Sequence, residues 1–197
     1  MARALKSLLA AVFAALALSG VAHAAGGNYV FDGGTPKQQA GVRNALNASS
    51  FDWSLIPAEI TIHIKGGVDT EAAPGEIWVD TRVLAAGKFA WGLIQHEMAH
   101  QVDFFLLEDA PRATLAEKLG GRSWWASGVV GHGDLGSERF ASTLAWAYWP
   151  SKANAMRPTS PRSESAAMAP AAFRSLLGRI LSSAGKSSAS AAALAHP

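Results

Sequence analysis

Gln95-His96-Glu97-Met98-Ala99-His100 lies in the middle of the strongest helical pattern in the sequence. His96 and His100 are four residues apart, so on an α-helix they share one face and lie about 5–6 Å apart. Both imidazoles can then bind one zinc ion, and Glu97 stands beside them as a general base. The stretch therefore predicts a zinc site built on a helix, and it sets the fold that must surround it.

The residues around this motif predict a helix from Lys88 or Phe89 to Leu107. An apolar stripe runs along it, offset from the two histidines: Trp91, Ile94, Met98, Val102 and Phe105. One face of the helix can therefore pack in a core while the other presents ligands. A chance match to the motif on a buried helix is the alternative, and the offset stripe argues against it.

A third ligand must come from elsewhere, because a catalytic zinc ion takes three protein ligands and one water. The chain has no cysteine, so the candidates are histidines and acids. Asp103 lies about 10 Å along the helix axis from His96, too far for its short side chain. Glu138 is the better candidate, although a glutamate at the start of its predicted helix, Ser137–Tyr148, could simply favour the helix dipole. Weaker candidates, expected to be solvated charges, are Glu108, Asp109 and Glu117.

The segment His96–Asp103 (HEMAHQVD), followed by Glu138–Ala141 (ERFA), resembles the zinc peptidase domain of the anthrax lethal factor-like gluzincins. The resemblance covers roughly residues 58–149. It implies Glu97 as the base and these zinc ligands: His96, His100 and Glu138. It also suggests that a strand before the ligand helix, here Glu76–Asp80, pairs with a peptide substrate.

Two further residues have open roles. Members of that family often place a tyrosine shortly before the third ligand, whereas this chain has His132 in a glycine-rich loop. His132 could stabilise an oxyanion as a second catalytic residue, or be a loop histidine without a role. Asp103 could accept the free ring N–H of a ligand histidine, or be a surface acid or a salt-bridge partner.

The remaining patterns predict an α+β fold of the zincin type. Short strands are expected near residues 29, 61 and 78, and a helix is expected at Pro36–Ala48, where Thr35 and Pro36 mark its start. This small twisted sheet would pack on the ligand helix, and a second helix would supply Glu138. Val68–Gly75 is polar and indicates a loop.

The first 24 residues predict a secretory signal peptide. Arg3 and Lys6 precede an apolar run, Leu8–Leu18, and an A-x-A end at Ala22–Ala24. Removing residues 1–24 leaves 17 − 2 = 15 basic against 15 acidic residues, so the secreted form is formally neutral. Without a basic stripe or a second apolar span, we expect neither a nucleic-acid partner nor a stable membrane anchor after cleavage.

The predicted domain organisation follows from composition. A zincin-like metallopeptidase domain occupies residues 25–150, and a Ser/Ala/Pro-rich extended linker occupies residues 151–169. An amphipathic helix follows at 170–184, with apolar residues at helical spacing. A disordered tail is expected at 185–197.

The predicted function is that of a secreted zinc-dependent metallopeptidase. Zinc-activated water would hydrolyse peptide bonds of a peptide or protein substrate, with Glu97 as general base. Two alternatives stay open: an exported binding protein with a structural zinc and no turnover, and a zinc amidase acting on cell-wall peptides. The sequence leaves the oligomeric state undetermined.

Overall fold

The computed structural model describes residues 27–125 and 130–194. The predicted signal peptide and the last three residues of the predicted tail lie outside these ranges. The helices and strands, in chain order, are β1 (Tyr29–Gly33), α1 (Pro36–Ala48), β2 (Ile60–Lys65), β3 (Glu71–Ala73), β4 (Glu76–Asp80), α2 (Thr81–Leu84), α3 (Phe89–Leu106), α4 (Asp109–Leu119), α5 (Gly136–Tyr148) and α6 (Pro170–Leu194). Short 3-10 helices add η1 (Trp53–Leu55), η2 (His132–Asp134) and η3 (Glu164–Ala166).

The fold is α+β, as predicted, with a four-stranded sheet in the order β1-β2-β4-β3. β1, β2 and β4 run parallel, while β3 is antiparallel to β4 and forms one edge of the sheet, with β1 at the other. Two predictions were wrong here. The expected loop at Val68–Gly75 contains β3, and the strand Glu76–Asp80, expected to pair with a peptide substrate, has no free edge because it lies between β2 and β3. Gly75, at φ +82°, makes the tight turn between β3 and β4.

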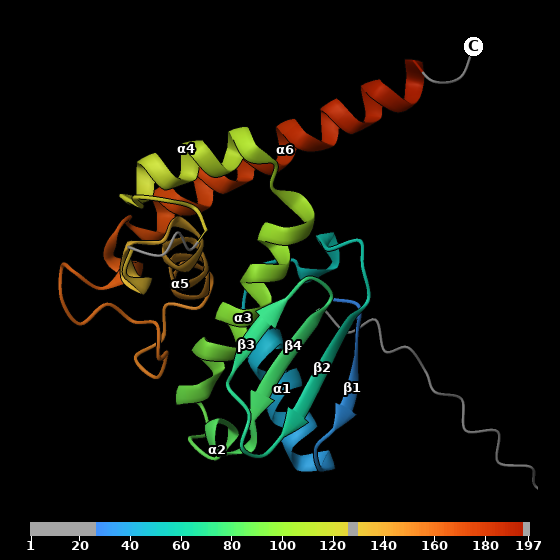
Figure 1. The fold of residues 1–197 in the computed structure, drawn as a ribbon, viewed down its shortest axis with the longest axis vertical. Helices are drawn as coiled ribbons and strands as arrows, with labels where there is room; N and C mark the ends of the chain where they lie inside the picture. The colour runs from blue at the N-terminus through green and yellow to red at the C-terminus, as the bar shows by residue number, and fades with distance from the viewer. Residues whose placement is uncertain (1–26, 126–129, 195–197) are drawn as a thin grey trace, which may run out of the picture.

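One face of the sheet packs against α1 and α3 (Figure 1). The alternation expected in β2 is present, because its three isoleucines are buried while the residues between them are more exposed. α3 contributes the apolar stripe opposite its histidines. The core between these elements contains Val42, Leu46, Ile60, Ile62, Ile64, Ile77, Val79, Ile94, Met98 and Val102.

A second layer of helices packs on the other side of α3. α5 crosses α3 and buries Phe140 and Leu144, and α6 covers α5 through Phe173 and Leu177. α6 begins at the predicted Pro170 and continues to Leu194, past the predicted end at residue 184. The extension is rich in alanine, the strongest helix former.

Residues 151–169, expected to form an extended linker, instead fold back against α5. Asn154 is buried and donates hydrogen bonds from Nδ2 to the carbonyl oxygens of Ala145 and Trp149. Gly92 on α3 makes room for it, because a Cβ there would lie 1.9 Å from Asn154 Oδ1. The segment is thus anchored where α3 and the end of α5 meet. Among the described residues, no helix has the length and apolarity needed to span a bilayer.

Candidate metal centre

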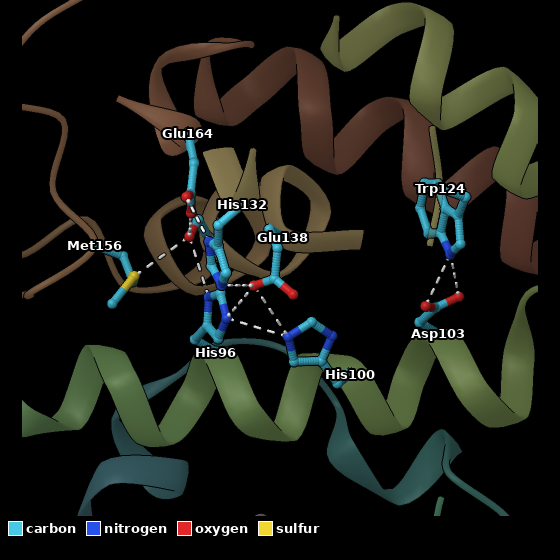
Figure 2. Close-up of polar contacts among 9 residues, drawn as sticks. His96, His100, Asp103, Trp124, His132, Glu138, Met156 and Glu164 are labelled. Atoms are coloured by element: carbon cyan, nitrogen blue, oxygen red, sulfur yellow. Dashed lines mark hydrogen bonds and ion pairs between the residues drawn. The ribbon is translucent and has the colours of Figure 1, made fainter. Parts of the chain in front are cut away.

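Two buried histidines on the middle of α3 point towards α5, as predicted. His96 and His100 lie one helical turn apart, and their Nε2 atoms are 3.1 Å from each other. Figure 2 shows both rings directed to the same side of the helix, towards Glu138. As predicted, the histidine face of α3 is directed to α5 while the apolar stripe packs in the core.

Glu138 lies in the first turn of α5, where close backbone packing fixes it. The start of α5 lies against the chain after α4: the Gly136 N–H donates to the Ser123 carbonyl, and a Cβ on Gly121 would lie 2.7 Å from Gly136 Cα. Only glycine at these two positions allows the two backbones to approach so closely. As a result, Glu138 Oε2 is 3.2 Å from His96 Nε2 and 3.6 Å from His100 Nε2.

These three side chains form a group that could hold a metal ion. One ligand atom from each of His96, His100 and Glu138 lies within 4.8 Å of the others. Two imidazole nitrogens and a carboxylate oxygen that converge on one point form a typical donor set for a divalent transition metal. The three residues that the sequence predicted as ligands therefore lie together in the structure.

The electrostatics of the group follow from burial. Burial lowers the pKa of His96, which keeps its ring neutral and able to bind a metal, although Glu138 acts in the opposite direction. Burial also opposes the charged form of Glu138, but its close contacts with the rings of His100 and His96 outweigh burial and hold the pKa of Glu138 below its usual range. The centre therefore combines the carboxylate of Glu138 with a neutral imidazole at His96.

Glu97 is nearly buried and lines the same cavity as the three ligands. With protein groups alone around it, burial raises its pKa to about 8, and the charges of Glu138 and Glu71 add to the increase. A cation held by the neighbouring ligands would favour the charged form. A carboxyl group in this position can both take and give a proton.

His132, on η2, reaches the centre from the solvent side. Its Nε2 lies 3.2 Å from Glu138 Oε2, and its Nδ1 lies 3.2 Å from Glu164 Oε1. Because carboxylate oxygens only accept, both contacts are hydrogen bonds when both ring nitrogens carry protons. The structure therefore places His132 at the site, and its catalytic role stays a prediction.

The ligands face a cavity of about 340 Å³. One wall is β3 with the residue before it, and another is aromatic, where Phe104 stacks on Trp125 at 5.7 Å between ring centroids. Trp124, the neighbour of Trp125, instead packs against the core. The site is thus open to a molecule that approaches along the sheet edge.

Asp103 stands apart from the ligands, further along α3 (Figure 2). It is fully buried, accepts a hydrogen bond from Arg112 Nε at 2.8 Å, and accepts another from Trp124 Nε1 at 2.9 Å. Of the alternatives for Asp103, the salt-bridge partner is therefore correct, and the surface acid is wrong. Its contacts connect α3 with α4 and with the chain after α4.

Sequence reasoning missed two polar residues of the site, Ser142 and Glu164. Ser142 is one turn after Glu138 on α5, a spacing that could have indicated it. Glu164 lies in the Ser/Ala/Pro-rich segment, where no local pattern marks it.

No family model matches the sequence, and no curated protein or solved structure matches the chain. The interpretation of the centre therefore depends on its own geometry and chemistry.

Proposed function

We propose that this protein is a zinc-dependent metallopeptidase with a zincin-like arrangement of its catalytic elements. His96, His100 and Glu138 would hold the zinc ion, and Glu97 would act as general base. The observation that carries the proposal is the spacing of the three ligand atoms.

The spacing fits a tetrahedral ion. Zinc binds imidazole nitrogen at about 2.0–2.1 Å and carboxylate oxygen at about 2.0–2.2 Å, which puts tetrahedral ligand atoms roughly 3.3–3.5 Å apart. The three distances between the ligand atoms here are 3.1, 3.2 and 3.6 Å. Three protein ligands beside an open cavity favour a catalytic site, since structural zinc sites are closed by a fourth protein ligand.

When bound, zinc would supply a Lewis acid that acidifies a water molecule and polarises the carbonyl of the substrate. Glu97 would accept the proton of that water at its carboxylate and pass it to the leaving amine. His132 would donate from Nε2 to the developing oxyanion, a role that its position 3.2 Å from Glu138 Oε2 supports.

A peptide substrate suits the edge strand. β3 pairs with β4 on one side only, and Thr70, Glu71 and Ala72 line the cavity that holds the ligands. An extended peptide can add to such an edge through backbone hydrogen bonds, which bring its carbonyl groups beside the centre. Secretion of the protein stays a prediction, because residues 1–24 lie outside the described part of the chain.

The test is to load the purified protein with zinc and to profile its cleavage of a mixed peptide library beside Glu97→Gln. The variant removes the base but none of the metal ligands, so we expect it to retain zinc and to lose about 10²–10⁴-fold in kcat. Glu117→Gln, an exposed glutamate on α4, is the matched control and should cleave like the wild type. Equal, negligible cleavage by all three zinc-loaded proteins would contradict the peptidase proposal and favour a binding protein.

A further inference from the structure

A chain of polar contacts leads from the ligand His96 to the segment between α5 and α6. The Nδ1 atom of His96 lies 3.1 Å from Ser142 Oγ, and the Ser142 hydroxyl donates to Glu164 Oε2 at 2.7 Å. The other oxygen of the same carboxylate, Oε1, lies 3.2 Å from His132 Nδ1. Glu164 therefore contacts both Ser142, the partner of His96, and His132, the predicted oxyanion donor. Figure 2 shows its carboxylate next to the ring of His132.

The directions of these hydrogen bonds follow from the available protons. The Ser142 hydroxyl has a single proton, and it lies closer to Glu164 than to its other acceptor, Met156 Sδ, at 3.4 Å. Because Ser142 donates its hydroxyl proton in the hydrogen bond to Glu164, its Oγ accepts from His96, so the His96 proton sits on Nδ1. The lone pair of the neutral ring is then on Nε2, the atom that faces His100 and Glu138.

The segment that carries Glu164 is held in place independently of the metal centre. Asn154 anchors it at Gly92, and Ser165, next to Glu164, is buried against α5. A carboxylate placed by such anchors can orient its partners rather than follow them. Ser142 itself is buried on α5, so removal of its hydroxyl would leave the His96 Nδ1–H without this partner.

We infer that Glu164 is a positioning residue for the metal centre, which fixes the ring of His96 through Ser142 and holds the ring of His132 directly. The inference builds on the proposed function, since it concerns how the same site is prepared for zinc. It assigns a functional role to residues 151–169. It also predicts that zinc affinity depends on a residue that cannot contact zinc.

The experiment measures two quantities for wild type, Glu164→Gln, Ser142→Ala and the double variant. The first is zinc affinity, by competition with a chelator of known affinity. The second is the protonation of His96 in zinc-free protein, by NMR of ¹⁵N-labelled histidine. Loss of a partner behind a ligand costs about 10–100-fold in metal affinity. We expect Ser142→Ala to lose zinc affinity within this range. Glu164→Gln should lose roughly tenfold, because Glu164 acts on His96 through Ser142. Glu117→Gln should change neither quantity.

If the chain of contacts acts as a unit, the double variant will lose little more affinity than Ser142→Ala alone. In Glu164→Gln the His96 and His132 signals should both shift, with the Nδ1–H form of His96 less populated. The inference would be overturned if Glu164→Gln bound zinc as tightly as wild type and left both histidine signals unchanged, even if it lowered the melting temperature. Absence of zinc binding by the wild type would contradict the proposed function, while the histidine signals would still test Glu164.

Discussion

Two clusters in this protein combine histidine with carboxylates, and they differ in the exposure of the carboxylates and in the way the ligand atoms are arranged. In the metal centre, the side chains of His96, His100 and Glu138 are 7, 8 and 15% exposed. In the second cluster, on the face of the sheet away from α1 and α3, His63 lies between Asp32 and Glu76, whose side chains are about half exposed.

In the second cluster each polar side chain forms a separate contact with another member of the cluster. His63 uses Nδ1 for Asp32 at 2.7 Å and Nε2 for Glu76 at 3.3 Å, and Lys65 also pairs with Asp32 at 3.0 Å. Its ring also stacks on Trp78, at 5.1 Å between centroids. The comparison teaches that composition does not make a metal site. Convergence of ligand atoms on one buried point is also needed, and of these two clusters only the one between α3 and α5 has it.

The largest expected contrast between the clusters is in zinc affinity. Glu138→Ala removes a proposed ligand, so we expect zinc affinity to fall well beyond the roughly 100-fold that removal of a partner behind a ligand costs. The matched variant, Glu76→Ala in the second cluster, should bind zinc like wild type. The measurement is zinc competition against a chelator at pH 7. Equal affinities for the two variants would remove Glu138 from the site.

Asp103→Ala separates stability from metal binding within α3. The change leaves Arg112 with no partner for its Nε, and loss of one member of a buried ion pair costs about 3–5 kcal/mol. We expect the lower end, roughly 3 kcal/mol, because the Arg112 side chain keeps some contact with water. Urea unfolding of the zinc-free protein measures the effect. A loss of zinc affinity without a loss of stability would instead give Asp103 a role behind the ligands.

His63→Ala tests the claim that the second cluster is only structural. Exposed ion pairs contribute about 0–1 kcal/mol, and the ring stack on Trp78 adds a similar amount, so we expect a loss of about 1 kcal/mol in unfolding free energy. Zinc content and peptide cleavage should not change. A drop in either would show that the two clusters are connected.

The smallest effect is the acid titration of the second cluster. Hydrogen bonds from His63 and Lys65 lower the pKa of Asp32 below its usual 3.8. A lowered folded-state pKa gives stability that is present above pH 3.8 and is lost as the pH falls through the folded value. Asp32→Asn should therefore lose this small contribution at neutral pH and show a shallower fall in stability below about pH 4, where the two proteins converge. If the stability of the variant below about pH 4 fell as steeply as that of the wild type, these contacts would not be made in solution.

The two clusters also show what a sequence can predict. His96 and His100 are a local pattern, since helix geometry alone puts them on one face, and Glu138 follows from the start of a second helix. The α+β class and the bounds of α1 came from capping and alternation. β3 could not be predicted, because three residues, Glu71–Ala73, are too few to show alternation and are a strand only by pairing with β4.

Glu164 was hidden for a different reason. Its place beside Ser142 and His132 depends on how residues 151–169 dock. The contact that anchors this segment joins Asn154 to Gly92, which are 62 residues apart in the sequence. Composition indicated a linker, because serine, alanine and proline give no periodic apolar pattern. Long-range docking of this kind is a tertiary property, and local patterns do not encode it.

X-ray absorption at the zinc edge, on protein loaded with one equivalent of zinc at neutral pH, tests the central claim most directly. The account predicts two imidazole nitrogens at about 2.0–2.1 Å together with light oxygen ligands, and loss of this signature in His100→Ala but not in His63→Ala. A protein that takes up no zinc, or a zinc environment that survives His100→Ala, would contradict it.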